Sequence, residues 1–567
     1  MCIKSFFSRK EKTEEKGPNQ NHFVSEIIFN NNSKLVLNDG DIVVFVGANN
    51  VGKSQALNDL YRNLYTYEKG IILNSIKINK EKIKEFFDKN FKTIRDRHQR
   101  LVYNVPMSNG ISDNEIEIYN KNSSYGLCRE AFVANINTES RLSICKPIDI
   151  LDDHEIATAP QQLLTTDNNR KETLSNKFFR AFKKRIFLNY YNSKKIKLCM
   201  GDDIVIEGDV CEQTIDSFAK KLDNYKLISE QGDGIKSFAG ILLFLALDFY
   251  RIFLIDEPEA FLHPPQAQIM GNIIGESIKN DQQAFISTHS ENFLKGLLDT
   301  CPNRVKIVRI SRIDDKNDFA ILNNEDLKTV WNDSLLRHSN ILQGLFYKTV
   351  ILCESDSDCK MYSIIDKFLK EKNGILPETM FIHCGGKSRL SKVIPIFKAL
   401  KVNLRIITDI DILDDRKNFA SFAQSIGIEW SDLKEDWLTI SDSISNIYKS
   451  VKRLTIKEMV KCGEPDLSQN EISDLKKLLD TECGWSQIKK GGFKMLGNAK
   501  AQDAFITINK KLNEKGAFIV PAGELESLII GCQGHGPTWV NAVLEKYPNL
   551  EDNIYEEIKK FVQSWNI

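Results

Sequence analysis

Residues 42–54 read IVVFVGANNVGKS, and this stretch decides the fold of the first half of the chain. A β-branched apolar run, IVVFV, is followed at once by Gly47, and the sequence after Ser54 (QALNDLYRNLY) has the apolar spacing of a helix. The order of strand, glycine-rich loop and helix is typical of a nucleotide-binding α/β domain. The loop matches the pattern G-x-x-x-x-G-K-[ST] in full and in the structural context that this pattern requires.

Phosphate chemistry explains the residue types of this loop. Its glycines let backbone N–H groups wrap around phosphates, and the N-terminus of the following helix favours an anion. Lys53 can reach the outer phosphates, and the Ser54 hydroxyl can bind Mg²⁺. An ordinary glycine-rich turn is the alternative. We expect ATP and Mg²⁺ as cofactors, with nucleotide contacts from Gly47, Asn49, Asn50, Gly52, Lys53, Ser54 and Gln55.

Two further strand-like runs end in residues that suit ATP hydrolysis. The run RIFLI is followed by Asp256 and Glu257, and the run QAFIS is followed by Thr288 and His289. Continuous apolar strands of this kind are typical of parallel sheets that are buried on both faces. An Asp at such a strand end can hold Mg²⁺, and the adjacent Glu can polarise the attacking water. We therefore expect Asp256 as a nucleotide and metal residue, and Glu257 and His289 as catalytic residues.

These motifs resemble the head of ABC-type ATPases, which carries a Walker A loop, a signature segment, a Walker B strand with its Glu, and a switch histidine. The resemblance implies a signature at Ser229, Gly232 and Gly234, although SEQGDG departs from LSGGQ. In that family the signature caps the nucleotide of an opposite head, which implies a homodimer or higher homo-oligomer. A Q-loop could lie at Gln161 or Gln162, and EPEAFLHP (257–264) is similar to a D-loop.

The second half of the chain carries carboxylates after two more strand-like runs. Glu354 follows TVILC, with Asp358 one turn into the next element, and Asp409 and Asp411 follow LRIIT. If these strands are parallel neighbours, the four carboxylates meet at the carboxyl edge of a sheet, with Asp409 and Asp411 on one face. So much negative charge repels itself unless a divalent cation binds, and oxygen ligands suit Mg²⁺ or Mn²⁺. A pair of acidic loop caps is the alternative.

The second pattern resembles a TOPRIM domain, whose motifs are an E-G-x-x-D-like strand end and a D-x-D. Glu354 matches the Glu, with Ser355 in place of the usual Gly, and Asp409 and Asp411 match the D-x-D. The sequence HCGGK (383–387) fits the glycine-containing connection between them. An ABC-type ATPase followed by a TOPRIM domain resembles the OLD-family (overcoming lysogenisation defect) nucleases, which include Gabija-type and retron-associated antiphage nucleases.

The composition along the chain and the OLD-family resemblance together predict the fold class and the domain boundaries. We expect an α/β chain with an ABC-type P-loop ATPase head and a TOPRIM α/β domain with helical additions. A flexible tail would span residues 1–22, the ATPase 23–345 with an insertion at about 70–225, and the TOPRIM domain 346–567 with a helical C-terminal part. In the late segment AGELE, the resemblance implies Glu526 as a metal ligand, with Glu524 as the fallback. His535 stands where the family is expected to carry a basic residue.

The same resemblance implies an ATP-regulated, Mg²⁺-dependent endonuclease that cuts double-stranded DNA, in antiphage defence. Its catalytic residues would be Glu354, Asp409 and Asp411, and a helicase, or a reverse transcriptase with noncoding RNA, could be its defence partner. The alternative is an ABC-type ATPase sensor or assembly module whose TOPRIM domain docks nucleic acid or a partner without cleaving. The expected metal ligands of both sites are Ser54, Asp256, Glu354, Asp358, Asp409, Asp411 and Glu526.

Composition limits how DNA and membranes could be bound. Lys and Arg number 77, as do Asp and Glu, so DNA must be held by local patches rather than by net charge. Candidate patches are residues 77–100, 180–197 and 489–494. The apolar run at 239–247 is far shorter than the roughly 18 residues that cross a bilayer. The 12 cysteines show no Cys-x-x-Cys spacing, so we expect a cytoplasmic protein with reduced thiols and no membrane anchor.

Overall fold

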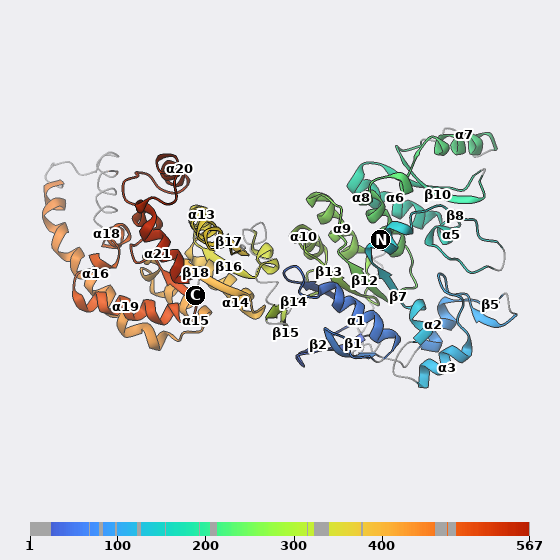
Figure 1. Cartoon of the computed structure of the whole chain (residues 1–567), viewed down its shortest axis with the longest axis horizontal. Helices are drawn as coiled ribbons and strands as arrows, with labels where there is room; N and C mark the ends of the chain where they lie inside the picture. Colours follow the sequence, from blue (N-terminus) through green and yellow to red (C-terminus); the bar gives the residue numbers. More distant parts are fainter. Residues whose placement is uncertain are drawn as a thin grey trace, which may run out of the picture. The chain divides into compact units, whose positions relative to one another are not determined.

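The computed structural model describes most of the chain, and the predicted tail at residues 1–22 lies outside the described residues. The described residues are 24–66, 68–78, 83–96, 99–121, 126–152, 155–191, 193–204, 212–313, 316–322, 340–375, 378–459, 473 and 484–565. The chain divides into two compact units (Figure 1). The first unit comprises Met1–Phe45, Gly52–Thr288 and Lys295–Val305, and the second comprises Val46–Val51, His289–Leu294 and Lys306–Ile567. The expected domain boundary at residues 345 and 346 stays a prediction.

Parallel strands form the centre of the first unit. They run side by side in the order β3 (Ile42–Val46), β13 (Gln283–Ser287), β12 (Ile252–Asp256) and β7 (Val133–Ile136). Every residue of β3 and β13 is buried, which confirms the expectation drawn from their continuous apolar sequences. Because parallel strands end at the same edge of a sheet, the residues that follow β12 and β13 lie close together.

Helices cover these strands, and the most apolar of them is buried over most of its length. The helix α1 (Lys53–Tyr65) contacts β12 and β13, and α8 (Asp233–Leu245) contacts β7, α4 (Thr138–Ser143) and α9 (Pro264–Ser277). All residues of α8 from Ser237 to Phe244 are buried, since its sequence is apolar on every side. The helix is therefore a core element of this unit.

The region at about 70–225, where an insertion stays a prediction, contains antiparallel strands and helices as well as β7 of the central parallel sheet. The strand β4 completes a three-stranded sheet of the order β2-β1-β4, whose other two strands precede residue 70. A second sheet has β10 paired antiparallel with β8, β9 and β11. The elements of these sheets and of the region are β1 (Val24–Phe29), β2 (Lys34–Val36), β4 (Leu73–Ile78), α2 (Ile83–Asn90), β5 (Thr93–Arg95), β6 (Leu101–Tyr103), α3 (Asp113–Lys121), β8 (Ile148–Asp149), α5 (Pro160–Leu164), α6 (Asn168–Phe182), β9 (Arg185–Asn189), β10 (Lys195–Gly201), α7 (Glu212–Asp223) and β11 (Lys226–Leu227).

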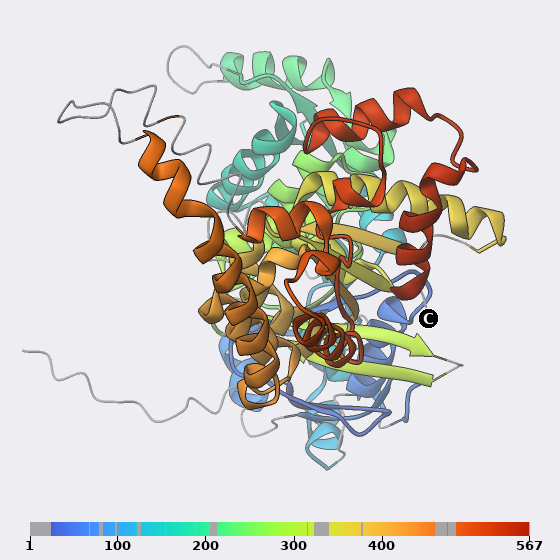
Figure 2. The same ribbon diagram turned by 90° about the vertical axis from the view of Figure 1, so that its left-hand side faces the viewer.

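A second parallel sheet forms the centre of the second unit. Its order is β17 (Thr379–His383), β16 (Thr349–Cys353), β18 (Asn403–Thr408) and β19 (Ala517–Ile519). The strands β16 and β18 are parallel neighbours, with Leu352 opposite Ile406. This is the pairing on which the expected meeting of carboxylates depends. The same unit contains an antiparallel pair, β14 (Val305–Ile313) and β15 (Lys316–Leu322), drawn as two long yellow-green arrows in Figure 2.

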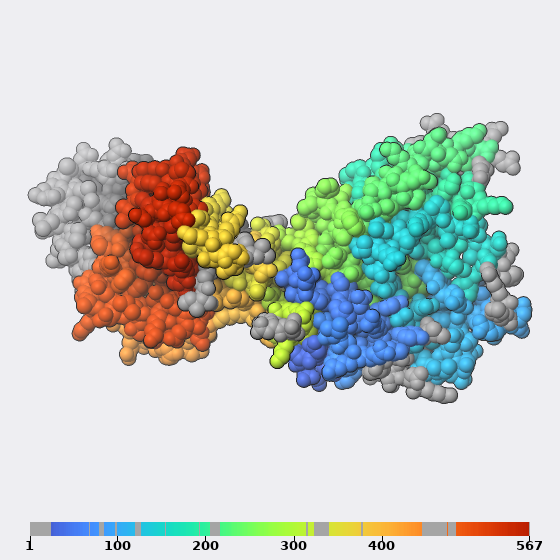
Figure 3. Space-filling model, viewed as in Figure 1, coloured from blue at the N-terminus to red at the C-terminus, as the bar shows by residue number. Residues whose placement is uncertain are grey.

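Helices surround this sheet and make up most of the described C-terminal part of the chain. The helix α13 (Asp356–Lys372) packs against α21 (Glu556–Trp565), and Figure 3 shows the red C-terminal residues beside the yellow residues of α13. Tyr362 and Trp565 contact edge to face in a core that also buries Trp539. The remaining helices are α14 (Leu390–Ala399), α15 (Arg416–Ile426), α16 (Trp430–Met459), α18 (Gly484–Gly491), α19 (Ala499–Asn513) and α20 (Pro537–Lys546).

No helix in the part of the chain that the structure describes is both long and apolar enough to span a membrane.

The close approach of α8 to α4 gives a test of the first unit. A Cβ atom added at Gly240 would stand 2.1 Å from the backbone carbonyl oxygen of Arg141, which cannot move without shifting a helix. Gly240→Ala should therefore lower the free energy of unfolding by about 1–3 kcal/mol, measured by urea denaturation. Gly232→Ala is the matched control at the start of the same helix, because a Cβ there meets nothing within 4 Å. Equal losses in the two variants would contradict the packing described.

Candidate functional site

The glycine-rich loop between β3 and α1 adopts the left-handed backbone that its sequence requires. Gly47, Asn50 and Gly52 have φ values of 143°, 62° and 100°. A Cβ at Gly47 would stand 2.2 Å from the backbone oxygen of Ile310, so only glycine fits this position. No side-chain hydrogen bond caps the start of α1 at Gly52, and a helix N-terminus that follows a glycine-rich loop favours an anion.

Lys53 is a buried cation at the start of α1, with 4% of its surface exposed. Burial lowers the pKa of its ammonium to about 8, while Glu257, Glu259 and Asp256 act in the opposite direction. A desolvated ammonium beside carboxylates is an effective partner for phosphate oxygens.

The two residues expected to hold the ATP-bound Mg²⁺ are in contact. The Ser54 hydroxyl donates a hydrogen bond of 2.8 Å to Asp256 Oδ1, and the Ser287 hydroxyl donates to the same oxygen. The parallel register explains this, since Asp256 and Ser287 are partners in β12 and β13. The Arg141 guanidinium donates to the backbone oxygen of Asp256 and fixes the strand end from the other side.

Glu257 occupies a backbone conformation that is unusual for a residue with a side chain. Its φ is 46°. Its N–H donates to two oxygens of Ser287, the backbone carbonyl at 3.0 Å and the hydroxyl at 3.2 Å. Left-handed non-glycine residues cost free energy and occur often at functional sites. Two residues on, Glu259 accepts a hydrogen bond of 2.8 Å from the Thr288 hydroxyl. His289 follows directly and is half-buried.

The signature candidate lies at the start of α8. Gly232 is the exposed N-cap residue, and Ser229 lies in the preceding 3₁₀ turn, η2 (Ile228–Glu230). A Cβ at Gly234 would stand 2.5 Å from the backbone oxygen of Phe261, so the signature candidate packs directly on the D-loop-like segment. The Phe261 ring is 56% exposed on a residue with a φ of 68°.

The side chains of the two Q-loop candidates, Gln161 and Gln162, form hydrogen bonds with backbone groups. Gln162 Oε1 accepts from the N–H groups of Thr158 (2.7 Å) and Ala159 (3.1 Å), which caps the start of α5. The Gln161 side chain is fully buried and donates to the carbonyl of Ile144. Both side chains therefore have structural partners in this conformation.

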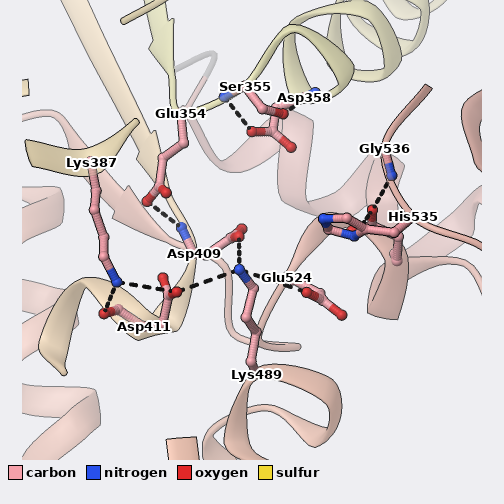
Figure 4. A network of polar contacts seen from close by, with 11 residues as sticks. Glu354, Ser355, Asp358, Lys387, Asp409, Asp411, Lys489, Glu524, His535 and Gly536 are labelled. Atoms are coloured by element: carbon pink, nitrogen blue, oxygen red, sulfur yellow. Dashed lines mark hydrogen bonds and ion pairs between the residues drawn. The ribbon is translucent and has the colours of Figure 1, made fainter. Parts of the chain in front are cut away.

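In the second unit, three expected carboxylates meet at the carboxyl edge of the parallel sheet (Figure 4). Carboxylate oxygens of Glu354, Asp409 and Asp411 all lie within 4.8 Å of one another, and Asp409 N donates to Glu354 Oε1 at 3.2 Å. The strand β18 ends at Thr408, and Asp409 caps a 3₁₀ turn, η5 (Ile410–Leu413). A turn therefore places Asp411 beside Asp409, rather than the strand alternation expected from their spacing.

Asp358 is used differently from the other three. Its carboxylate accepts from the Ser355 N–H at 2.9 Å, and its own N–H donates to the Ser355 hydroxyl at 3.3 Å. This reciprocal capping box starts α13 and explains why a serine stands where the TOPRIM pattern has glycine. Burial raises the pKa of Asp358, while its hydrogen bonds with Ser355 act to lower it.

Two lysines that the sequence did not assign to this site pair with its carboxylates (Figure 4). Lys489 Nζ lies 3.1 Å from Asp409 Oδ2 and 3.4 Å from Asp411 Oδ2. Lys387 Nζ lies 3.1 Å from Asp411 Oδ2 and donates to the Asp411 backbone oxygen at 2.8 Å. The sequence contains both signals, since Lys387 ends the HCGGK connection and Lys489 begins the basic patch at residues 489–494.

A second group of possible ligands contains Glu524, Glu526 and His535, whose ligand atoms also lie within 4.8 Å of one another. Glu526 Oε1 lies 2.6 Å from His535 Nδ1 and accepts from Gly536 N at 2.9 Å. Glu524 Oε2 lies 3.8 Å from Lys489 Nζ. The preferred residue, Glu526, therefore pairs with the exposed His535, and the fallback, Glu524, reaches toward the first group.

Burial, together with charge repulsion, disfavours the ionised forms of Glu354 and Asp409. Burial, followed by the charges of Asp409 and Asp411, holds the pKa of Glu354 well above its usual range. Burial likewise raises the pKa of Asp409 to about 7, although Lys489 opposes the shift. Asp411 Oδ1 is buried and has no hydrogen-bond partner among the described residues. Crowded carboxylates with an unpaired oxygen fit a divalent cation such as Mg²⁺.

The fold and these residues define a P-loop ATPase unit joined to a TOPRIM-type unit. Family models agree with this class: one described as "AAA domain, putative AbiEii toxin, Type IV TA system" matches residues 157–295, and one described as "Overcoming lysogenization defect protein-like, TOPRIM domain" matches residues 345–411. A curated relative is the "Old nuclease" of Escherichia phage P2, which is 22% identical over 320 residues. Together these matches confirm the expected resemblance and support an OLD-family ATPase–TOPRIM protein.

The alignment with the phage P2 protein covers 53% of this chain and 49% of that protein, so the chain spans about half the length of the curated relative it matches. Solved structures with similarity include an SmcHead bound to the C-winged helix domain of ScpA, with a TM-score of 0.34, 14% identity and coverage of 53% of this chain and 99% of that chain. An Smc head domain from Pyrococcus furiosus has a TM-score of 0.31, 12% identity and coverage of 55% and 99%.

The raised pKa of Asp409 predicts an unusual gain of stability on mutation. A carboxyl whose pKa is higher in the folded state binds more protons there, so its contribution to folding stability falls as pH rises from about 4 to about 7. Asparagine cannot ionise and removes this penalty. Asp409→Asn in a chelating buffer should therefore raise the free energy of unfolding at pH 8 by about 1–3 kcal/mol, and much less at pH 5.

Denaturation curves at the two pH values measure this effect. Asp503→Asn on the exposed surface of α19 is the control and should change little at either pH. A loss of stability in Asp409→Asn at pH 8 would show that the ion pair with Lys489 outweighs the repulsion.

Proposed function

We propose that the chain is an ATP-regulated, divalent-metal-dependent endonuclease of double-stranded DNA that acts in antiphage defence. The observation that carries the proposal is the meeting of Glu354, Asp409 and Asp411 at the carboxyl edge of the second parallel sheet. The TOPRIM match over residues 345–411 includes all three, and the nuclease name of the phage P2 relative supports the reaction class. The P-loop in the same chain supports regulation by ATP.

The carboxylates would hold Mg²⁺ or Mn²⁺, and a metal bound there would activate water and stabilise the leaving oxygen of a phosphodiester. Glu354, Asp409 and Asp411 are the proposed ligands, with Glu526 and Asp358 as further ones. The high pKa of Glu354 also suits a group that accepts a proton from water during the reaction. Glu354 is thus proposed as ligand or general base.

The proposed roles in ATP hydrolysis rest on the motifs, and the Ser54–Asp256 hydrogen bond supports one of them. The loop and Lys53 would bind the phosphates, and the Ser54–Asp256 pair would hold the nucleotide's Mg²⁺. Glu257 would polarise water, and His289 would contact the γ-phosphate. The exposed signature candidate could contact a nucleotide that is bound to a second head, so we propose a homodimer or higher homo-oligomer. The geometry of this oligomer would control the access of DNA to the carboxylate site.

We propose that DNA is contacted by local basic patches. One of these patches is less suitable, because its cations already form ion pairs with carboxylates. In the patch at 180–197, Arg180, Lys184 and Arg185 pair with Glu276, Asp202 and Asp203. The patch at 489–494 lies beside the carboxylate group and is the better placed. We further propose a cytoplasmic location and a defence partner, either a helicase or a reverse transcriptase with noncoding RNA.

One observation favours the second candidate, an ATPase sensor or assembly module with a non-cleaving TOPRIM domain. The ammonium groups of Lys387 and Lys489 neutralise the negative charge of the D-x-D motif. A surface that docks nucleic acid without a metal ion would need this neutralisation. The two functions differ in whether the protein breaks a phosphodiester bond under any condition.

Plasmid cleavage decides between them. Purified protein with supercoiled plasmid, Mg²⁺ or Mn²⁺, and varied ATP should produce nicked or linear DNA. Asp409→Ala and Asp411→Ala should each lower the rate by about 100-fold or more, because each removes a proposed ligand. Asp503→Ala is the surface control and should cleave normally. Cleavage that is absent in every condition while DNA still binds would favour the docking module.

Nucleotide assays separate binding from hydrolysis in the ATPase unit. Lys53→Ala should lose both ATP binding and turnover, since it removes the buried cation that would meet the phosphates. Glu257→Gln should still bind ATP, with turnover lower by about 100-fold or more. Fluorescent-nucleotide binding and phosphate release measure the two steps. Unchanged ATP turnover in Lys53→Ala would show that the P-loop assignment is wrong.

A further inference from the structure

The ammonium of Lys489 lies among the oxygens that a metal ion would use. Its partners in the described part of the chain are all carboxylates: Asp409 at 3.1 Å, Asp411 at 3.4 Å and Glu524 at 3.8 Å. The Lys489 side chain is 28% exposed, and the three carboxylates are 14–20% exposed. Figure 4 shows the ammonium between Asp409, Asp411 and Glu524.

Backbone packing fixes the position of Lys489. A Cβ at Gly523 would stand 2.0 Å from the Lys489 carbonyl oxygen, so α18 lies directly on the segment that carries Glu524. Two hydrogen bonds hold the contact, from Phe493 N to Pro521 O at 3.1 Å and from the Ser527 hydroxyl to Lys490 O at 2.9 Å. The carbonyl of Gly523 in turn accepts from Ile410 N at 2.8 Å, which joins this segment to the turn of Asp409 and Asp411.

Lys387 provides a comparison with the same charge. It contacts one carboxylate, Asp411, and also donates to the Asp411 backbone oxygen, so part of its role is to hold the turn. Lys489 instead bridges two D-x-D carboxylates and Glu524. A metal ion about 2.1 Å from oxygens of Asp409 and Asp411 would lie close to the Lys489 ammonium, and like charges at such a distance repel strongly.

We propose that Lys489 is a built-in competitor for the divalent cation: the ion binds Asp409 and Asp411 only when the ammonium leaves them. The inference rests on the proposed metal role of these carboxylates. It makes Lys489 a residue that sets metal affinity, since the free energy of breaking two close ion pairs opposes loading of the site. Replacement of Lys489 by a neutral side chain of similar length removes that opposition.

Titration calorimetry of Mn²⁺ into the nucleotide-free full-length protein tests the competition without relying on DNA cleavage. Lys489→Met should bind Mn²⁺ about tenfold or more tightly than the unmodified chain, a change of about 1.4 kcal/mol or more. Lys387→Met should give a smaller gain, and Lys490→Met, on the next residue of α18, should bind within about twofold of the unmodified chain. Equal gains in Mn²⁺ affinity for Lys489→Met and Lys387→Met would show that only the net charge of the site matters, and would overturn the proposal. Mn²⁺ binding by Lys489→Met that is unchanged or weaker would also overturn it.

Thermal unfolding provides a second measurement in case Lys489→Met is less stable. In EDTA the variant should melt below the unmodified protein, because its carboxylates lose their counter-ion, and Mn²⁺ should raise its Tm by more than it raises that of the unmodified protein. A smaller or equal rise would contradict competition. Mn²⁺ binding that follows this pattern without any DNA cleavage would defeat the proposed nuclease function and leave the role of Lys489 standing.

Discussion

Three carboxylates that meet at one end of a parallel sheet cannot all carry their charge unless a cation lies among them, and the site of the second unit depends on this constraint. The parallel pairing of β16 and β18 brings Glu354 and Asp409 to the same edge, and the turn after β18 adds Asp411. Burial raises the cost of negative charge on Glu354 and Asp409, as their high pKa values show. The elements that surround these carboxylates therefore have to supply positive charge to them.

The chain supplies that charge from two directions. Lys387 comes from the connection after β17, and Lys489 comes from α18, whose backbone is held against Gly523 and Pro521. A lysine ammonium and a divalent cation are two solutions to the same electrostatic problem, and they exclude each other at Asp409 and Asp411. The first unit meets a related problem by hydrogen bonding, since hydroxyls of Ser54 and Ser287 both donate to Asp256.

Local sequence predicted the parts of the sites that lie on one strand end or in one loop. The P-loop, Asp256, Glu257 and the D-x-D motif each follow directly from a buried strand, so periodicity and motif spacing found them. Ser355 and Asp358 could be interpreted in two ways, because S-x-x-D is both a capping box and a possible ligand spacing, and the structure uses it as the cap.

Lys489 could be identified only as a basic patch, because its role depends on a long-range contact. It lies 78 positions beyond Asp411, and no local pattern records that α18 packs on the segment containing Gly523. The same limit applies to Glu524 and Glu526, whose order in the sequence does not show which of them faces Lys489. Helix and strand identity follows from short-range periodicity, whereas the partner of a charged side chain follows from tertiary packing.

The central claim is that Glu354, Asp409 and Asp411 form a divalent-cation site from which Lys489 must withdraw. Anomalous diffraction from crystals grown with Mn²⁺ tests it most directly. A manganese peak is expected at about 2.1–2.3 Å from oxygens of these three residues, with the Lys489 ammonium turned away from Asp409 and Asp411. Crystals in which manganese is absent from these oxygens at saturating concentration, or lies there with both lysine ion pairs unchanged, would contradict it.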